Sequence, residues 1–401
     1  MNIPPLPLED AQARLLGLIE PMPVEHVDIE GALGRYLAAP LLARRTQPSA
    51  PLSAMDGYGV SAGDMAGPWR VIGESAAGHP YDGILRSGEA VRISTGAVVP
   101  ETAVSVILQE DIARDGDSLT LVGEPPAPPE KHIRPRGMDF TDGQQVLSAG
   151  QRISAAQAAL AMAAGHRHLP VRRRPRLTII DSGDELASDC ENCLPHQIPA
   201  SNGTMLAAMA ASLPCVIERL GPVADRMDAL AAVLDQAQEA DVIVTSGGAS
   251  VGDHDLVRPA LEAWGAKIDF WRVAIKPGKP LLVARRGHQL ILGLPGNPVS
   301  NHVTAYLFLL PLLRGLLGAA EPFPRPIRTT LSAPLRAGGA RREFLRAAWD
   351  GREIAAQSIQ DSGALTPLAA SNALIERDAG APPAQAGDAV TAYLLENGGI
   401  A

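Results

Sequence analysis

The chain has 401 residues, of which 46% are hydrophobic, 20% are charged and only 3% are aromatic. This length predicts roughly two to four domains, and this composition is that of a globular protein. The formal net charge of -9 argues against nucleic acid as the main partner, and the scarcity of aromatic residues disfavours base-stacking surfaces.

The same sequence disfavours a membrane or secreted protein. The longest apolar run, residues 305–313, contains Pro311 and is followed by Arg314, so it is too short to span a bilayer. The first residues lack the basic and apolar regions of a signal peptide, and three cysteines cannot form a disulfide framework. We therefore expect a cytoplasmic protein with no membrane partner.

In the first half of the chain, the sequence pattern changes several times between helix-like and strand-like segments. Apolar spacing predicts helices over residues 8–20, 30–39 and 154–164. Between residues 53 and 140, short β-like runs alternate with clusters of Gly, Pro and Asp, which predicts a small, mostly-β module. The basic segment 172–176 then begins a new domain.

Beyond Arg176 strands and helices alternate, which predicts a parallel or mixed α/β sheet that binds its ligand at the carboxyl ends of the strands. The expected strands are 177–180, 216–220, 242–245, 281–284 and 290–292. The expected helices are 204–213, 229–238, 256–264 and 299–317. After a proline-rich linker, residues 327–393 return to short strands and predict a small β domain.

The segment 275–300 combines positive charge with rigid backbone. Lys276 and Lys279 are separated by Pro and Gly, so they lie on a stiff loop and not on a helix face. The turn 293–300 follows, and Pro298 can occupy the first turn of the next helix, whose N-terminus favours anions. These features predict an anion pocket, with a solvated turn carrying two surface lysines as the alternative.

Two further loops of the α/β region leave the ends of predicted strands. Residues 181–186 carry three carboxylates within five positions. Residues 246–255 combine glycines, which allow close approach to a phosphate, with Asp253 and Asp255, either of which could hold a divalent metal. One such loop alone is typical of an ordinary turn, but three on one sheet predict a single site.

The spacing of Cys190, Cys193 and His196 is similar to that of a metal site. A structural zinc site needs four ligands, however, and only Cys215 remains elsewhere, so we do not predict a metal here. His254 lies between two aspartates, and we interpret it as a loop residue.

Several segments together resemble the molybdopterin molybdenumtransferases, the MoeA and gephyrin E-domain family. The resemblance covers about residues 5–395 and rests on the following segments, in this order: S-A-M-D-G-Y (53–58), R-I-S-T-G-A (92–97), I-R-P-R-G-M-D (133–139), S-G-D-E-L (182–186), S-G-G-A-S-V-G-D-H-D (246–255), I-K-P-G-K-P (275–280) and G-L-P-G-N-P-V-S (293–300). Motifs in this combination and order are highly specific for that family.

The resemblance implies a multidomain α/β plus β fold. Residues 1–45 and 141–174 would form an elongated dimerisation domain, with the helix 8–20 able to pack on the α/β domain, and residues 46–140 an inserted β module. Residues 175–321 would form an α/β molybdopterin-binding domain of the MogA/MoaB kind, and residues 322–401 a C-terminal β-barrel-like domain.

The implied reaction inserts molybdate into adenylylated molybdopterin, with Mg²⁺-assisted release of AMP. A metal needs clustered carboxylates, and a tetrahedral oxyanion needs Lys, Arg and hydroxyl donors. The resemblance also implies a homodimer, with molybdopterin adenylyltransferase and molybdoenzyme chaperones as candidate protein partners.

Carried onto this chain, the resemblance implies the following site residues. Glu185, Asp225 and Asp255 would bind metal and orient water, with Asp253 nearby. The oxyanion set would be Lys276, Lys279, Ser300, Arg346 and Ser362. The walls for pterin and phosphates would be Gly247, Gly248, Ser250, Pro295, Gly296, Asn297 and Pro298. Asp56, Thr95 and Asp139 would reach the pocket of the other subunit.

The chain departs from the family pattern at three positions. Val104 stands where Asp is common, Asp181 where Ser is usual, and Ala200 replaces an acidic residue before Ser-Asn. These changes affect loop detail and remove no metal or oxyanion candidate. Two alternative functions stay open: a non-catalytic molybdopterin-binding or scaffold paralogue, and adenylyl transfer to molybdopterin.

Overall fold

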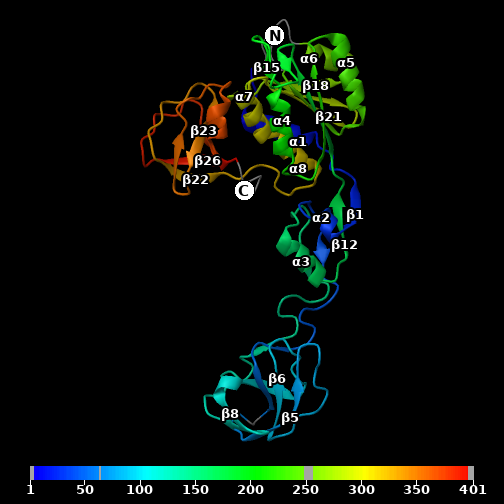
Figure 1. Ribbon diagram of the computed structural model, residues 1–401, viewed down its shortest axis with the longest axis vertical. Helices are drawn as coiled ribbons and strands as arrows, with labels where there is room; N and C mark the ends of the chain where they lie inside the picture. Colours follow the sequence, from blue (N-terminus) through cyan, green and yellow to red (C-terminus); the bar gives the residue numbers. More distant parts are fainter. Residues whose placement is uncertain (1–3, 63–64, 248–255, 396–401) are drawn as a thin grey trace.

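The computed structural model describes residues 4–62, 65–247 and 256–395. Its shape is elongated (Figure 1): a broad head contains an α/β domain beside a C-terminal β domain, a narrow stalk extends below the head, and a β module forms the opposite end. No helix among the described residues is long and apolar enough to cross a membrane.

The α/β domain is built on a mixed sheet with the strand order β16-β13-β17-β21-β20-β18. These strands are β13 (Arg176–Ser182), β16 (Val216–Val223), β17 (Val242–Ser246), β18 (Lys267–Trp271), β20 (Leu282–Arg286) and β21 (Gln289–Leu294). The first four in the order are parallel, and β20 is antiparallel to both of its neighbours. Because β13, β17 and β21 run side by side, the loops after them leave the same edge of the sheet.

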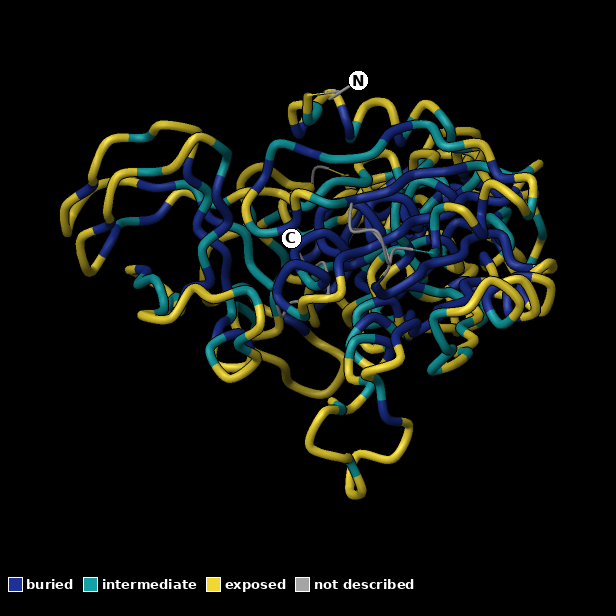
Figure 2. The backbone as a smooth tube through the Cα atoms, turned by 90° about the horizontal axis from the view of Figure 1, so that it is seen from above, coloured by how far each residue is buried: buried dark blue, intermediate teal, exposed yellow. Residues whose placement is uncertain are grey.

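Helices cover both faces of this sheet. One face packs against α1 (Leu8–Gly17), α4 (Ser201–Ala210), α7 (Pro298–Thr304) and α8 (Leu310–Leu316). The other face packs against α5 (Met227–Gln236) and α6 (Val257–Ala263). Figure 2 shows the buried residues concentrated in this domain and the exposed ones in the loops at its rim.

The helix expected over residues 299–317 is present with one irregularity. The π-helical segment η3 (Ala305–Leu309) lies between α7 and α8, and Pro311 follows it in the first turn of α8. Proline has no amide hydrogen to donate, so a change in hydrogen-bond pattern before it is expected. The helix expected over residues 8–20 ends earlier, at Gly17.

The stalk pairs β1 (Val24–Asp28) with β12 (His168–Arg172) and β2 (Leu41–Leu42) with β11 (Gln145–Leu147), and adds α2 (Ile29–Ala32) and α3 (Ala155–Ala163). The prediction of a helix over residues 30–39 is wrong. Only Ile29–Ala32 is helical, because Tyr36 and Leu37 instead form β-bridges with Arg152 and Val171. Long-range pairing overrides the local apolar spacing here.

The β module has the strand order β7-β4-β6-β5-β9-β8. Its strands are β4 (Gly57–Ser61), β5 (Trp69–Ser75), β6 (Glu89–Ile93), β7 (Ala103–Leu108), β8 (Ile112–Asp115) and β9 (Ser118–Leu121), with η1 (Gln109–Asp111) between β7 and β8. A short pair, β3 (Leu52–Ser53) and β10 (Ile133–Arg134), lies where the chain enters and leaves the module.

The C-terminal domain is a closed β-barrel. Its strands are β22 (Ile327–Leu331), β23 (Arg342–Trp349), β24 (Glu353–Ala356), β25 (Ala373–Arg377) and β26 (Ala389–Leu394). The order β23-β24-β22-β26-β25 is closed by an additional pairing of β23 with β25. The short strand β19 (Ile275–Lys276), from the cationic loop of the α/β domain, pairs with β23 and so attaches the barrel to the α/β domain.

Candidate functional site

The loops after β13, β17 and β21 meet at one edge of the sheet. The Gly247 amide donates to the carbonyl of Leu294 at 3.1 Å. A Cβ at Gly247, where φ is +100°, would lie 2.7 Å from the Ser182 carbonyl oxygen, and a Cβ at Gly296 would lie 3.7 Å from the Gly247 Cα. Glycine is therefore required at Gly247, and bare backbone lines this edge of the sheet.

Two acidic candidates, Glu185 and Asp225, lie on neighbouring loops. Asp225, which follows β16, accepts a hydrogen bond from Ser182 Oγ at 2.9 Å, and its amide donates to Asp184 Oδ1 at 3.0 Å. These bonds hold Asp225 against the loop that carries Glu185. Glu185 is exposed, and among the described residues its carboxylate has no hydrogen-bond partner. Its oxygens are therefore accessible to a ligand.

The fit of this region to Mg²⁺ rests on its donor chemistry. The described residues contain no group of three His, Cys, Asp or Glu side chains that could hold a metal ion. Gly248, Ser250, Asp253 and Asp255 lie outside those residues. Mg²⁺ is commonly held by one or two carboxylates plus substrate phosphates, however, and Glu185 and Asp225 supply two carboxylates.

The two lysines of the cationic loop differ in their surroundings. Lys276 Nζ lies 2.8 Å from Glu343 Oε1, and the Glu343 side chain is only 10% exposed. Lys279 is exposed, and the described part of the chain offers its ammonium group no ion pair. The loop reaches α7 at Gly278, where φ is +105° and a Cβ would lie 2.6 Å from Thr304 Cγ2. This contact brings the loop beside the buried Ser300 of the same helix.

The turn before α7 connects the α/β domain to the C-terminal domain. Asn297 Nδ2 donates to Ser362 Oγ at 3.0 Å, and the Val299 backbone amide donates to the Ser362 carbonyl at 3.0 Å. Within the turn, Asn301 Nδ2 donates to the carbonyl of Pro295 at 3.0 Å. Pro298 occupies the first turn of α7, as the sequence predicts. Ser362 is thus held at the helix N-terminus, where an anion is favoured.

Arg346 is buried beside the loop that carries Ser362. It is 1% exposed, and its guanidinium donates to the carbonyls of Ala364, at 2.9 Å, and Ile359, at 3.1 Å. Its Nε has no hydrogen-bond partner among the described residues. Arg346 thus holds the loop that carries Ser362, and its predicted contact with an oxyanion stays a prediction.

Asp56, Thr95 and Asp139 lie far from this edge of the sheet. The backbone amide and Oγ1 of Thr95 donate to Asp56 Oδ1 at 2.7 and 3.0 Å, and these bonds lower the pKa of Asp56. Both residues belong to the β module at the opposite end of the molecule (Figure 1). Asp139 lies where that module joins the stalk, and its amide donates to Gln47. Within one chain, none of the three joins the site.

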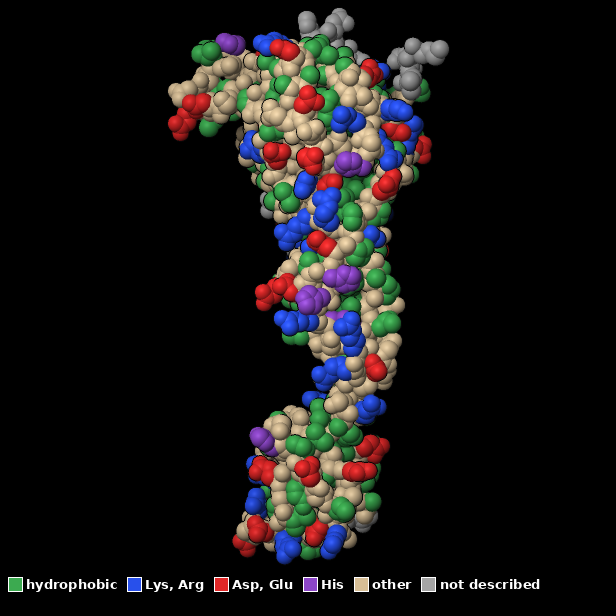
Figure 3. Space-filling view, turned by 90° about the vertical axis from the view of Figure 1, so that its right-hand side faces the viewer, with side chains coloured by type: hydrophobic (Ala, Val, Ile, Leu, Met, Phe, Trp, Pro, Cys, Tyr) green, Lys and Arg blue, Asp and Glu red, His purple; other side chains and the backbone are tan. Residues whose placement is uncertain are grey.

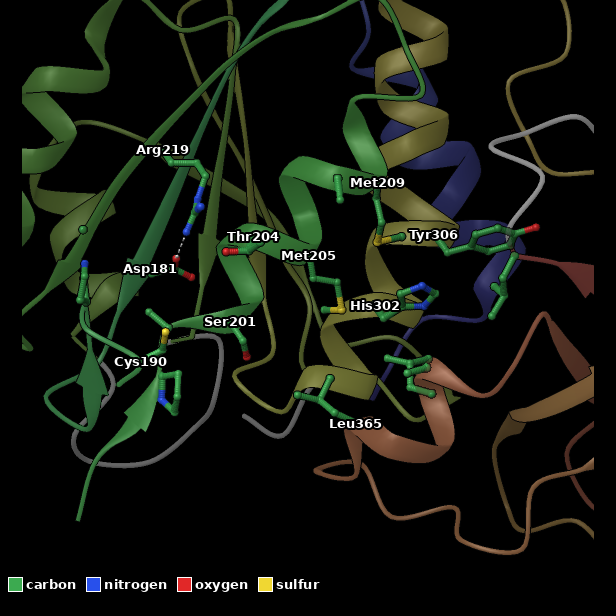
Figure 4. Close-up of a pocket in the computed structure, with 18 of the residues that line it drawn as sticks. Asp181, Cys190, Ser201, Thr204, Met205, Met209, Arg219, His302, Tyr306 and Leu365 are labelled. Atoms are coloured by element: carbon green, nitrogen blue, oxygen red, sulfur yellow. Dashed lines mark ion pairs between the residues drawn. The ribbon is translucent and has the colours of Figure 1, made fainter. Parts of the chain in front are cut away.

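A cavity of about 1080 Å³ lies beside the site, along α4 (Figure 4). None of the residues named above as candidates lines it. Figure 4 shows Asp181 and Arg219 toward one end, the thioethers of Met205 and Met209 in the middle, and Leu365 of α9 (Leu365–Ala369) opposite. The cavity therefore lies between the α/β domain and the C-terminal domain.

Asp181 lines this cavity, and sequence reasoning assigned it no role, although it belongs to the acidic loop 181–186 and departs from the family pattern. It is 4% exposed, Oδ2 lies 3.8 Å from Arg219 Nη2, and Oδ1 has no partner among the described residues. Burial raises the pKa of Asp181, and Arg219 opposes that rise. A Cβ at Gly203, in the first turn of α4, would lie 2.1 Å from Oδ2. Glycine at that position makes room for the carboxylate.

Known proteins resemble this chain over nearly its full length. Residues 6–165 match the family described as the MoeA N-terminal region (domain I and II), residues 178–315 the probable molybdopterin binding domain, and residues 328–395 the MoeA C-terminal region (domain IV). A molybdopterin molybdenumtransferase from Haemophilus influenzae is 33% identical over 320 residues, which are 79% of each chain. The chain belongs to the molybdopterin molybdenumtransferase family.

Another relative supports this membership. The molybdopterin molybdenumtransferase 2 of Mycobacterium tuberculosis is 36% identical over 338 residues, which are 81% of this chain and 83% of the relative. The crystal structure of a molybdopterin biosynthesis MoeA protein from Pyrococcus horikoshii superposes with a TM-score of 0.85 at 25% identity, covering 98% of this chain and all of that one. The predicted multidomain fold, with its α/β domain, β module and C-terminal barrel, is confirmed.

Proposed function

We propose that this chain inserts molybdate into adenylylated molybdopterin and releases AMP in a Mg²⁺-dependent step. The observation that carries the proposal is the meeting, at one edge of the sheet, of four features: the acidic loop of Glu185, the glycine backbone at Gly247, the cationic loop beside α7, and the N-terminus of α7, which holds Ser362. This arrangement offers donors to oxyanions and carboxylates to a metal in the same place.

We assign molybdate to the side of the site that contains Lys279. Its ammonium group carries no partner among the described residues, and Ser300 and Ser362 supply hydroxyl groups near the start of α7. Lys276 adds positive charge that Glu343 partly neutralises. Preorganised donors of this kind stabilise negative charge that develops on an oxyanion during transfer.

We assign the phosphates to the backbone at Gly247 and Gly296, and hydrolysis of the adenylyl link to Glu185 and Asp225. When bound to these two carboxylates, Mg²⁺ would supply positive charge at the phosphates. Glu185, which is exposed, would orient the attacking water and accept its proton. The cavity beside α4 has room for the organic part of the substrate, with Asp181 as a buried acceptor.

We further propose a cytoplasmic homodimer in which the β module of one subunit completes the site of the other. Asp56 and Thr95 are hydrogen-bonded to each other at the end of the molecule remote from Glu185, so only a second chain can bring them to the site. Asp139, at the base of the same module, is assigned to the same surface.

The experiment is a turnover assay of the full-length protein with adenylylated molybdopterin, molybdate and Mg²⁺, in which AMP is quantified chromatographically. The wild-type protein should release AMP only when molybdate and Mg²⁺ are both present. Glu185→Gln should bind the substrate and release little AMP, whereas Glu262→Gln, an exposed glutamate of α6, should match the wild type.

The alternatives give different results in the same assay. Tight substrate binding without AMP release would favour the scaffold function. Consumption of ATP with free molybdopterin, without any need for molybdate, would favour adenylyl transfer. Either result would contradict the proposed reaction.

A further inference from the structure

A second cavity, of about 460 Å³, lies where the stalk joins the head. The stalk contributes Tyr36 and Arg152, α8 contributes Arg314, and the linker to the C-terminal domain contributes residues 320, 321 and 323–325. None of the residues assigned above to the molybdate site lines this cavity. It is a separate feature, and the function proposed above does not use it.

Arg314 is a buried cation without an acidic partner. It is 6% exposed, and Nη1 donates to the carbonyl oxygen of Pro322 at 3.2 Å. The described residues provide no carboxylate within ion-pair distance of its guanidinium. Burial lowers the pKa of Arg314, and the hydroxyl of Tyr36 partly offsets this. A buried charge without a counter-charge is costly, so this position favours an anion.

Arg152 adds a second positive charge to the same cavity. Its Nε donates to the carbonyl of Gly34 at 3.3 Å, and its charge contributes to the lowered pKa of Arg314. No described carboxylate forms an ion pair with Arg152. Two guanidinium groups that repel each other therefore line one cavity, and an anion bound between them would relieve this repulsion.

Some other arginines near this junction have carboxylate partners. Arg35 pairs with Glu25, and Arg173 pairs with Asp241 at 2.8 Å. At the rim of the cavity, Arg325 pairs with Glu321, so these two charges cancel. Figure 3 shows Lys and Arg side chains gathered on the visible face of this narrow junction. Among the arginines that line the cavity, Arg152 and Arg314 have no carboxylate partner in the described part of the chain.

We propose that this cavity is an oxyanion site, in which Arg152 and Arg314 bind inorganic phosphate or the phosphate group of a phosphate monoester. Guanidinium groups match the geometry of phosphate oxygens and donate two parallel hydrogen bonds. The Tyr36 hydroxyl, which also lines the cavity, completes the donor set. A bound anion would connect the stalk, α8 and the linker, and so fix the angle at which the stalk leaves the head.

The test is isothermal titration of the full-length protein with inorganic phosphate and, separately, with glycerol 3-phosphate. Arg152→Gln removes a half-buried charge and is expected to weaken phosphate binding by about tenfold or more, as for the loss of one charged hydrogen bond. Arg258→Gln, whose guanidinium pairs with Glu262 on α6, is the matched control and should bind like the wild type. Arg314→Met should abolish phosphate binding. If the Arg314→Met variant does not fold, the phosphate affinity of Arg152→Gln still tests the proposal.

A second measurement locates the bound ion. Hydrogen exchange should slow on adding phosphate at residues 148–152, 320, 321 and 323–325, which line the cavity. Tighter binding of glycerol 3-phosphate than of phosphate would identify a phosphate ester as the ligand. The inference is overturned if the wild-type protein binds neither probe, if Arg152→Gln binds them unchanged, or if Lys279→Met abolishes binding while Arg152→Gln does not.

Discussion

Lys276 Nζ lies 2.8 Å from Glu343 Oε1, and this ion pair joins the cationic loop of the α/β domain to strand β23 of the closed barrel. The backbones of β19 and β23 also pair at these two residues. Lys279, on the same loop, has no such partner among the described residues. The two lysines therefore contribute differently: Lys276 to the joint between domains, and Lys279 to ligand binding.

Lys276→Met should destabilise the protein, whereas Lys279→Met should not. Removing Lys276 leaves the largely buried Glu343 carboxylate unpaired, which we expect to cost about 1 to 2 kcal/mol. Removing the exposed Lys279 should change the free energy of unfolding by less than about 0.5 kcal/mol. Urea unfolding measures both values, and molybdate-dependent AMP release should fall strongly in Lys279→Met.

The double variant Lys276→Met/Glu343→Gln is the control for this difference. It removes both charges, so it should recover most of the stability lost in Lys276→Met. Equal stability of the two single lysine variants would show that the ion pair does not hold the domains together.

Gly203→Ala should destabilise the α/β domain through Asp181. The new Cβ would lie 2.1 Å from the Asp181 carboxylate, which has little room to move because Asp181 is buried. We expect a loss of about 1 to 3 kcal/mol, despite the higher helix propensity of alanine. The urea midpoint measures this loss.

Combining the change with Asp181→Ser tests the cause. The shorter side chain removes the overlap, so Asp181→Ser/Gly203→Ala should be more stable than Gly203→Ala alone. Additive effects of the two substitutions would mean that Gly203 and Asp181 are not coupled.

His302 should make stability depend on pH between about 4 and 6.5. Burial lowers the pKa of this imidazole from 6.5 to about 4, so in that window the unfolded chain binds a proton that the folded chain does not. Stability must therefore rise with pH through this window and fall as the pH drops from 6.5 toward 4. Unfolding midpoints of the wild type and His302→Gln, measured from pH 4 to 7, should differ in slope there.

Exposed His196 is the matched control for this titration. His196→Gln should keep the wild-type slope. A wild-type slope in His302→Gln would show that His302 is not the group responsible.

Mixed dimers should recover activity if the site is shared between subunits. Asp56→Asn removes a site residue of the β module, and Glu185→Gln removes a site residue of the head. Each homodimer should therefore be inactive. After subunit exchange, random pairing leaves one intact site in each heterodimer, which restores about a quarter of wild-type AMP release.

The control mixes Glu185→Gln with Lys279→Met. Both substitutions lie in the head of their own chain, so neither site of the heterodimer is intact and no activity should return. Recovery in this control, or none in the first mixture, would contradict the shared site.

The sequence predicted what short-range signals encode. The alternation of strands and helices after Arg176 correctly predicted the α/β domain, and Pro298 correctly predicted the start of α7. The π-helical turn Ala305–Leu309 was not predicted, because its hydrogen-bond pattern depends on packing around a buried helix. The closure of the barrel by β23 and β25 was not predicted in detail either, because it joins strands that are separated in sequence.

Motifs located the loops of the candidate site but not what each side chain contacts. For Arg346 the motif predicted an anion contact, which stays a prediction, but it gave no sign of the bonds to the carbonyls of Ile359 and Ala364, which tertiary folding brings to it. Asp181 was noted as one carboxylate of the loop 181–186 and as a departure from the family pattern, but it was assigned no role. Its buried position beside Arg219 depends on the packing of α4 against β13 and β16, and no local pattern encodes that packing.

The most direct test of the proposed function is a crystal structure of the full-length protein soaked with molybdate and AMP, with anomalous diffraction collected at the molybdenum edge. The account predicts a molybdenum peak beside Lys279, Ser300 and Ser362, with the AMP phosphate against Gly247 and Gly296. A map in which molybdenum is absent from this position, while AMP or molybdenum binds only elsewhere, would contradict it.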